Sequence, residues 1–263
     1  ITYTISGEGH PVLLIHGFGE DGRIWEKIIN TLNSDNKIIV VDLPGSSKST
    51  LLHSDNKTIG IEDYAEVIRA ILEQENIEKI TVIGHSMGGY IALAFAELYP
   101  AMLSGLGLFH STCFADDDKK KETRLKGINF VKDNGALAFL KTSVPPMFAE
   151  DFQKESSTVV EDLVDNGRDF TDDAVIQYYT AMMNRKDRSD VLLNITVPVL
   201  FIVGEKDQAV PLEQSLKQLH LPARSLIKIL PDAAHMGMLE EPGVCIGAIQ
   251  QFLNIRTETM KVN

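Results

Sequence analysis

The sequence predicts an α/β protein with a doubly wound, mainly parallel β-sheet that is interrupted by one all-helical insertion. Two observations support this fold class. Short apolar runs rich in β-branched residues alternate with amphipathic helical patterns over residues 1–111 and again over residues 194–263. Between residues 112 and 193 this alternation stops, and only helical or irregular patterns occur. Alternating strands and helices form parallel sheets with right-handed crossovers.

Five strands are predicted before the insertion, and each is a short run of apolar residues bounded by turns. The first alternates weakly, whereas most of the others are continuously apolar, as expected for strands buried on both faces of a parallel sheet. These strands are expected at residues 2–6, 12–15, 37–41, 79–83 and 103–109. Helices with one apolar face connect them at about 24–32, 61–74 and 90–98, and residues 46–57 form a polar loop.

The insertion begins with the acidic run at 116–118 followed by three lysines, a charge order that favours a helix start. Pro145 and Pro146 separate shorter helical patterns inside it. After the insertion, residues 197–203 form the most apolar run of the chain, and residues 225–230 are the last predicted strand. Short helices are expected after Pro211 and at about 244–253.

The overall composition fits one large domain, because 263 residues can bury a sizeable core. We expect residues 1–111 and 194–263 to form that core. A net charge of −12 argues against nucleic acids and anionic membranes as partners. No apolar run reaches the roughly 18 residues of a membrane span, and two cysteines do not make a disulfide framework. We therefore expect a cytoplasmic protein, although the first residue, Ile1, leaves a trimmed start open. The oligomeric state is not predicted.

The stretch from Gly84 to Gly88 carries the most specific local signal. It reads G-x-S-x-G between a predicted strand and a predicted helix, which is the context of a nucleophile elbow. Ser86 would lie on a strained turn, and a Cβ at either glycine would clash where strand and helix crowd together. Alone, the motif also fits a simple glycine turn.

Two further residues follow their own strands at the same edge of the predicted sheet, Asp207 and His235. Ligand sites of such sheets lie beyond the carboxyl ends of the strands. A serine hydroxyl needs a base to take its proton, and a histidine base needs a carboxylate to orient it. Ser86, Asp207 and His235 are therefore candidate nucleophile, acid and base.

Several motifs occur together in register: HGFG at 16–19, DLPG at 42–45, GHSMGG at 84–89, GEKD at 204–207 and AH at 234–235. On these motifs the chain resembles the α/β-hydrolase-fold serine hydrolases. The resemblance implies the triad Ser86, Asp207 and His235. It also implies an oxyanion hole made by the backbone N–H groups of Phe18 and Met87.

The resemblance further implies that residues 112–193 form a helical cap over the active site. Its aromatic and methionine side chains favour an apolar substrate. The residues expected to contact substrate are Trp25, His110, Phe148, Met182 and Met236. For these residues a packing role stays open, and for His110 a structural role is equally open.

Two details of the resemblance leave the site open. Ser47 replaces a glycine that is common in the family's D-x-P-G-x-G-x-S loop, so the conformation of that loop is not predicted. The acid could also lie among residues 116–118, as in some family members. We expect no cofactor and no metal, because the seven histidines show no metal-ligand spacing.

The expected activity is hydrolysis of small to medium apolar carboxylic esters through an acyl-Ser86 intermediate. An enol-lactonase or a C–C bond hydrolase of the same fold remains an alternative, and so does a small-molecule receptor that turns over slowly. A haloperoxidase side activity also stays open, whereas a haloalkane dehalogenase would require Asp at position 86. We expect the insertion to select the substrate without contributing to the chemistry.

Overall fold

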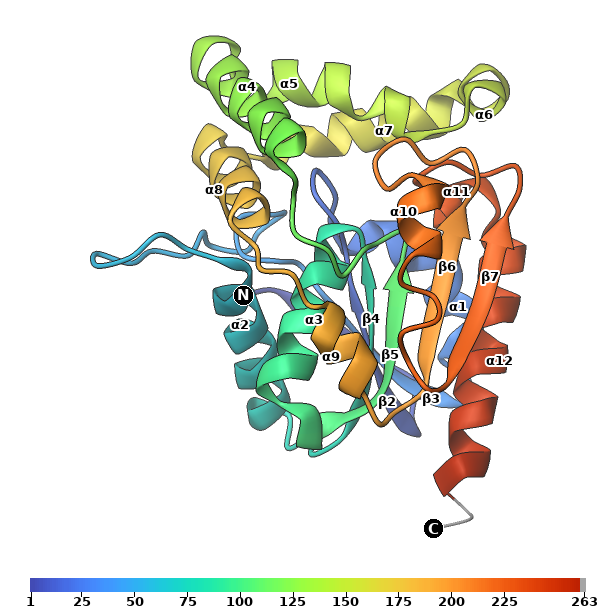
Figure 1. The fold of residues 1–263 in the computed structure, drawn as a ribbon. Helices are drawn as coiled ribbons and strands as arrows, with labels where there is room; N and C mark the ends of the chain where they lie inside the picture. Colours follow the sequence, from blue (N-terminus) through green and yellow to red (C-terminus); the bar gives the residue numbers. More distant parts are fainter. Residues whose placement is uncertain (261–263) are drawn as a thin grey trace.

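A seven-stranded sheet runs through the centre of the protein (Figure 1). The computed structural model describes residues 1–260 and the side chains of residues 1–255, so residues 261–263 of the predicted core lie outside it. The strand order is β1-β3-β2-β4-β5-β6-β7. β1 pairs antiparallel with β3, and the remaining pairs are parallel. The strands are β1 (Tyr3–Ser6), β2 (His10–Ile15), β3 (Asn36–Val41), β4 (Ile80–His85), β5 (Leu103–Phe109), β6 (Val199–Gly204) and β7 (Ser225–Leu230).

Helices cover both faces of the sheet, as the alternating sequence pattern predicts (Figure 1). β4, β5 and β6 are buried along their whole length, which explains their continuously apolar sequences. Within residues 1–260, no helix combines the length and the hydropathy needed to cross a membrane. One face carries α2 (Ile61–Gln74), α3 (Met87–Leu98) and α9 (Ser189–Asn194), and the other carries α1 (Glu26–Leu32) and α12 (Pro242–Met260).

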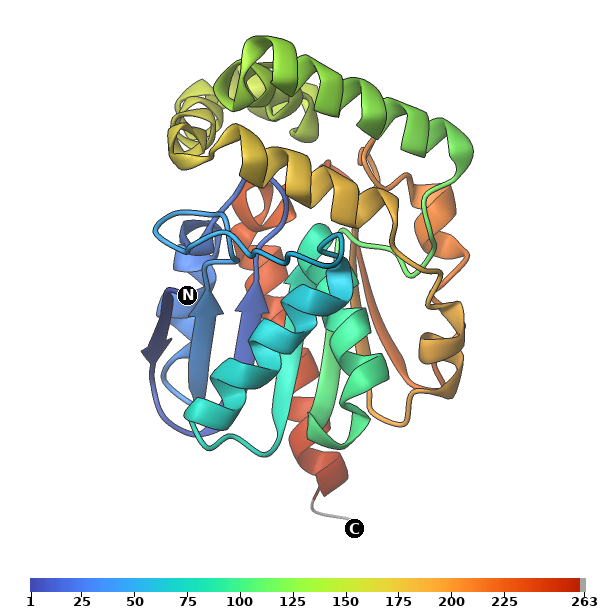
Figure 2. The same ribbon diagram turned by 90° about the vertical axis from the view of Figure 1, so that its left-hand side faces the viewer.

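Between β5 and β6 the chain forms only helices, and those before α9 lie across the end of the sheet to which the parallel strands point (Figures 1 and 2). We call residues 112–193 the helical insertion. It holds α4 (Asp118–Asn134), α5 (Ala136–Ser143), η3 (Pro145–Met147), α6 (Glu150–Glu155), α7 (Ser157–Asn166), η4 (Gly167–Asp169), α8 (Asp172–Met183) and the start of α9. The insertion therefore lies over the carboxyl ends of β2, β4, β5 and β6.

The two ends of the helical insertion are fastened to each other. The Arg188 N–H donates to the Cys113 carbonyl at 2.8 Å, and the Arg185 guanidinium donates twice to the Phe114 carbonyl, at 3.1 and 2.9 Å. Arg185 also forms an ion pair with Asp116 at 2.7 Å, and both side chains are buried. A broken buried pair would leave an uncompensated charge, so these contacts hold the two connections together.

Three short elements complete the fold beside the carboxyl edge of the sheet. Gly22–Trp25 forms a turn of 3₁₀ helix before α1. α10 (Leu212–Leu216) follows β6, and α11 (Gly237–Glu240) follows β7. The polar loop predicted at residues 46–57 lies between β3 and α2, and within it Ser47 has a φ of 48°. A left-handed conformation explains why glycine is common at this position in the family.

Candidate active site

Ser86 lies on a sharp turn between β4 and α3. Its φ of 49° and ψ of −113° are strained for a residue with a side chain. The turn is held on both sides, because the Ser86 N–H donates to the Phe109 carbonyl at 2.9 Å and the Ser111 hydroxyl donates to the Ser86 carbonyl at 2.8 Å. Ser86 is half-buried, whereas the residues on either side of it are buried. The fold therefore presents this serine at the edge of the sheet.

Two glycines permit this turn by letting backbones approach closely. A Cβ on Gly84 would lie 2.1 Å from the Gly88 carbonyl oxygen. A Cβ on Gly88 would lie 2.4 Å from the Ile15 carbonyl oxygen. Neither contact is compatible with a larger residue, so β2, β4 and α3 meet at Ser86 only because both positions are glycine.

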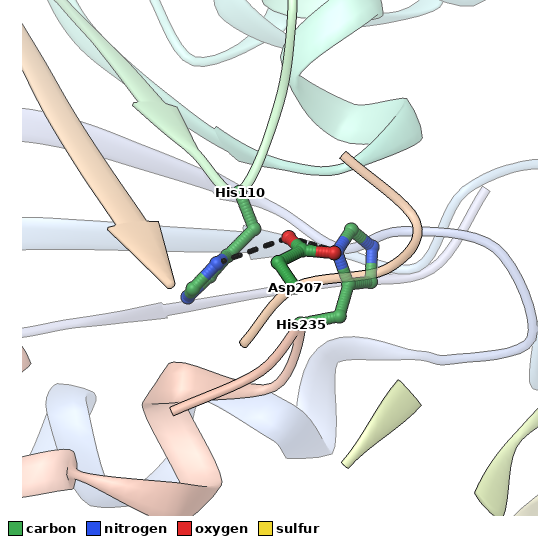
Figure 3. A group of neighbouring side chains, drawn as sticks. All are labelled: His110, Asp207 and His235. Atoms are coloured by element: carbon green, nitrogen blue, oxygen red, sulfur yellow. Dashed lines mark hydrogen bonds and ion pairs between the residues drawn. The ribbon is translucent and has the colours of Figure 1, made fainter. Parts of the chain in front are cut away.

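His235 and Asp207 contact each other directly (Figure 3). The His235 Nδ1 lies 2.8 Å from Asp207 Oδ2, and both side chains are almost fully buried. Asp207 Oδ1 accepts hydrogen bonds from the N–H groups of Ala209 and Val210, at 2.8 and 2.9 Å. The carboxylate can only accept here, so His235 Nδ1 carries the proton and its Nε2 keeps a lone pair. Such a ring is oriented as a general base.

The charge of Asp207 is stabilised although the group is buried. Burial acts to raise the pKa of this carboxyl, but the facing His235 ring and the hydrogen bonds outweigh that effect and hold the pKa well below its ordinary value. Asp207 is therefore a carboxylate at neutral pH.

His110 packs against the same carboxylate. Its Nδ1 accepts a hydrogen bond from the Gly204 N–H at 3.1 Å and lies 3.4 Å from Asp207 Oδ2. The accepting Nδ1 makes the ring neutral, and burial lowers the pKa of His110 to about 4. A Cβ on Gly237 would lie 2.5 Å from its Nε2. His110 is thus enclosed beside Asp207, with a φ of 46°.

His110, Asp207 and His235 are also the one group within the described residues that could hold a metal ion, with ligand atoms within 4.8 Å of one another (Figure 3). Their facing atoms already have hydrogen-bond partners. His235 Nδ1 donates to Asp207, and His110 Nδ1 accepts from Gly204. These three residues are therefore arranged to orient His235 as a base.

Two backbone N–H groups near the Ser86 turn have no hydrogen-bond partner among the described residues. In the described part of the chain, neither the Phe18 N–H nor the Met87 N–H has a hydrogen-bond acceptor. Met87 is the first residue of α3, so its N–H points out of the helix N-terminus. Gly17 brings the Phe18 loop close to the serine, since a Cβ on Gly17 would lie 3.1 Å from the Ser86 Cβ. Of the two predicted oxyanion donors, Met87 thus follows Ser86 directly, and Phe18 follows a glycine that lies against Ser86.

The helical insertion supports the loop that carries Phe18. The Phe18 ring lies 4.6 Å from the Tyr179 ring and 6.3 Å from the Phe139 ring, centroid to centroid. Tyr178 also contacts Phe18, at 6.4 Å. Aromatic pairs at these separations are favourable, so side chains of α5 and α8 fix the position of Phe18.

The insertion also contacts the loop that carries His235. The His235 N–H donates to the Met147 carbonyl at 2.8 Å, and the Ala149 N–H donates to the Glu240 carboxylate at 2.9 Å. Glu240 accepts from the N–H groups on both sides of His235 as well. The backbone of the insertion therefore bonds directly to the loop that carries His235. The expectation that the insertion selects the substrate without contributing to the chemistry stays a prediction, and these contacts give a reason to test it.

The other residues expected to contact substrate are almost fully buried. Trp25 packs edge-on against Phe109 of β5, with ring centroids 5.5 Å apart. Phe148 stacks on Phe152 within the insertion, at 5.6 Å. All have relative exposures of 2% or less: Trp25, His110, Phe148, Met182 and Met236.

The alternative acid at residues 116–118 does not contact His235. Asp116 pairs with Arg124 and Arg185 in the insertion. Asp117 caps α4 by accepting the Lys120 N–H at 2.7 Å. The structure brings Asp207, and none of these three aspartates, to the histidine.

Sequence reasoning missed one buried pair beside Ser86. The His85 Nδ1 lies 2.9 Å from Glu20 Oε2, and both side chains are at most 2% exposed. His85 occupies an unassigned position of the GHSMGG motif, and Glu20 directly follows the HGFG motif. The polar character of these two positions was the available signal.

Comparison with known proteins agrees with this architecture. The model of a family described as alpha/beta hydrolase fold matches residues 10–125. Among solved structures, a thermophilic esterase from Thermogutta terrifontis with malate bound aligns with a TM-score of 0.91 and 27% identity, over 97% of this chain and 93% of that chain.

Two curated relatives match most of the chain. The dihydrolipoyllysine-residue acetyltransferase component of the acetoin cleaving system of Pseudomonas putida is 28% identical over 246 residues, which are 90% of this chain and 62% of that protein. The chain thus spans less than two thirds of that relative. The 2-hydroxy-6-oxo-6-(2'-aminophenyl)hexa-2,4-dienoic acid hydrolase of Metapseudomonas resinovorans is 25% identical over 273 residues, 97% of this chain and 88% of that protein.

Proposed function

This chain has the α/β-hydrolase fold, and on that premise we propose that it is a serine hydrolase that cleaves carboxylic esters through an acyl-Ser86 intermediate. The observation that carries the proposal is the contact of 2.8 Å between His235 Nδ1 and Asp207 Oδ2, at the same edge of the sheet as the strained Ser86 turn. It leaves His235 Nε2 as an acceptor, and a serine hydroxyl needs such a base to take its proton.

In the proposed reaction, His235 Nε2 takes the Ser86 proton as the serine oxygen attacks the ester carbonyl carbon. The tetrahedral intermediate collapses, the C–O bond to the alcohol breaks, and His235 returns the proton to the leaving oxygen. A water then attacks the acyl-Ser86 ester by the same route, which releases the acid. Asp207 stays ionised throughout and stabilises the imidazolium.

The oxyanion is proposed to accept hydrogen bonds from the Phe18 and Met87 N–H groups, which have no acceptor in the described part of the chain. The partial positive charge at the N-terminus of α3 adds to this stabilisation. Removing one such donor typically costs a factor of about 10² to 10³ in rate. Preorganised backbone donors are therefore a substantial part of the proposed rate enhancement.

The helical insertion is proposed to act as a cap that surrounds the acyl or alcohol group. Phe148 and Met182, which keep 2% exposure, are the insertion residues proposed to contact substrate, whereas the enclosed core residues Trp25, His110 and Met236 are proposed to support the site by packing. Apolar contacts of this kind favour small to medium apolar esters.

The test is steady-state turnover of p-nitrophenyl acetate, butyrate and octanoate, together with covalent labelling by a fluorophosphonate. We expect turnover of at least one ester and labelling of Ser86. Ser86→Ala should remove both, whereas Ser104→Ala, a matched change at the opposite end of the sheet on β5, should remove neither. Labelling of another serine, or an active Ser86→Ala protein, would contradict the assignment.

The same experiment separates the alternatives. Turnover of lactones or of 2-hydroxy-6-oxo dienoic acids in preference to esters would move the proposal to an enol-lactonase or a C–C bond hydrolase. The relative from Metapseudomonas resinovorans makes the second of these substrate classes worth including. A single burst without steady turnover of any substrate would favour a receptor.

A further inference from the structure

Glu20 and His85 form a buried pair beneath the proposed catalytic groups. Glu20 Oε2 accepts the Gly17 N–H at 2.8 Å and contacts His85 Nδ1 at 2.9 Å. The other ring nitrogen of His85, Nε2, lies 2.9 Å from the carbonyl oxygen of His235. One imidazole therefore bridges the loop before α1 and the loop that carries the proposed base.

The hydrogen-bond partners indicate the protonation of this ring. The His235 carbonyl can only accept, so His85 Nε2 must carry a proton. A second proton lies between His85 Nδ1 and Glu20. Burial acts to raise the pKa of the Glu20 carboxyl, but His85 and the Gly17 N–H outweigh it and the pKa falls below its ordinary value. Burial acts to lower the pKa of His85, but Glu20 and the His235 carbonyl raise it above 6.5. The second proton therefore belongs to the imidazole.

The Glu20–His85 pair adjoins the proposed nucleophile, the loop of the proposed oxyanion donor and the loop of the proposed base. His85 immediately precedes Ser86 at the end of β4. Glu20 fixes the Gly17 N–H, in the residue before the proposed oxyanion donor Phe18. The hydrogen bond from His85 Nε2 to the His235 carbonyl fixes the backbone of His235. The imidazole rings of His85 and His235 lie 4.8 Å apart, centroid to centroid. None of these contacts involves a reacting atom.

We propose that Glu20 and His85 form a carboxylate–imidazolium pair whose role is to position the oxyanion loop and the base loop with respect to Ser86. This inference rests on the proposed serine hydrolase function. Both are positioning residues. Loss of the pair should misplace the loops by a fraction of an ångström, and such displacements lower rates strongly without abolishing substrate binding.

The first test measures the charge of the pair without any substrate. Nitrogen-resolved NMR of the histidine rings across a pH titration should show both ring nitrogens of the wild-type His85 protonated at pH values at which a free histidine has lost one proton. In Glu20→Gln only one should remain so. The other titratable side chains facing the pair are Asp207, His16, His110 and His235. Because three of these are histidines, the His85 signal is assigned with the variant His85→Gln. A wild-type His85 with a single ring proton would overturn the proposal.

The second test measures positioning. For Glu20→Gln we expect kcat on p-nitrophenyl acetate to fall roughly 10- to 100-fold while KM changes less than about threefold. Fluorophosphonate labelling of Ser86 should slow comparably. The double variant Glu20→Gln/His85→Gln should lose about as much as the worse single variant, because the pair acts as one unit.

The matched control is Asp21→Asn, the same chemical change at the neighbouring buried carboxylate, which pairs with Arg23 instead. We expect lower thermal stability and a kcat within about twofold of wild type. Wild-type labelling and kcat in Glu20→Gln would overturn the proposal. If Glu20→Gln does not fold, His85→Gln and the wild-type NMR signal decide. If even the wild-type protein is not labelled by the fluorophosphonate, the proposed function fails, and the NMR result still decides the charge of the pair.

Discussion

The backbone N–H of His235 donates a hydrogen bond to the carbonyl oxygen of Met147, across 2.8 Å. This bond joins the proposed base to the helical insertion rather than to the sheet. A second contact, between the rings of Phe18 and Tyr179, does the same for the proposed oxyanion loop. The insertion is therefore part of the framework that holds the site.

We predict that Tyr179→Leu lowers kcat/KM on acetate, butyrate and octanoate esters alike, by roughly 10-fold, because the Phe18 loop loses its aromatic support. Kinetics with the three esters measure this. Phe152→Leu is the matched control, since Phe152 stacks on Phe148 in the same insertion. A loss limited to octanoate in Tyr179→Leu would instead support the expectation that the insertion only selects substrate.

Asp207→Asn should leave the protein folded and lower kcat by about 10³- to 10⁴-fold, because His235 loses the carboxylate that fixes its tautomer. Asp116→Asn provides the comparison. It removes the negative partner of two arginines, so it should lower the free energy of unfolding by about 3–5 kcal/mol while the folded protein stays active. Ester kinetics and urea unfolding measure the two effects. If Asp116→Asn abolished activity and Asp207→Asn did not, the catalytic acid would be Asp116 of the insertion.

His110 should make the protein less stable in mild acid. Below its ordinary pKa of 6.5 this histidine takes a proton in the unfolded chain, whereas burial keeps it neutral in the folded protein down to about pH 4. The unfolded state then binds more protons, so the free energy of unfolding falls as the pH is lowered through this window. The difference in pKa corresponds to about 3 kcal/mol.

The measurement is urea unfolding of wild type and His110→Asn between about pH 7 and pH 4. Asparagine tolerates a positive φ and offers an acceptor in place of Nδ1. We expect the variant to lose less stability across this range than wild type does. His220→Asn, a change at an exposed histidine, should keep the wild-type slope. Equal slopes for wild type and His110→Asn would refute the prediction.

Ser47→Gly should raise the free energy of unfolding by about 1 kcal/mol. Ser47 has a φ of 48°, and a left-handed conformation costs a residue with a Cβ about that much. Ser46→Gly should do the opposite, since the buried Ser46 hydroxyl donates to the Leu43 carbonyl at 2.8 Å. Thermal and urea unfolding of both variants measure the difference. If Ser47→Gly lowered the free energy of unfolding, contacts made by the Ser47 side chain would stabilise the protein by more than the backbone strain costs.

The sequence predicted the fold and the three proposed catalytic residues because these depend on local order. Ser86, Asp207 and His235 each follow their own strand, and parallel strands end at one edge of a sheet. The apolar runs, helical periods and glycine spacing are all properties of short stretches. The fold class is confirmed, as is the resemblance to the α/β-hydrolase fold.

The supporting contacts were not predictable in the same way. The Met147 carbonyl is a backbone group, so no side chain marks its bond to His235. The contact between Phe18 and Tyr179 depends on how the insertion lies over the sheet, which hydrophobic periodicity does not encode. Likewise, Glu20 and His85 are 65 residues apart in sequence and meet only in the folded protein.

The fastened connections of the helical insertion bear on how a substrate reaches Ser86. Arg185 and Arg188 lock the two stems together through backbone carbonyls and a buried aspartate. The helical insertion could swing as a rigid body only if its two connections to the core were free to bend, and these connections are fastened to each other. We therefore expect substrate entry to use local motions of side chains and short helices, which are faster and smaller than the swing of a whole domain.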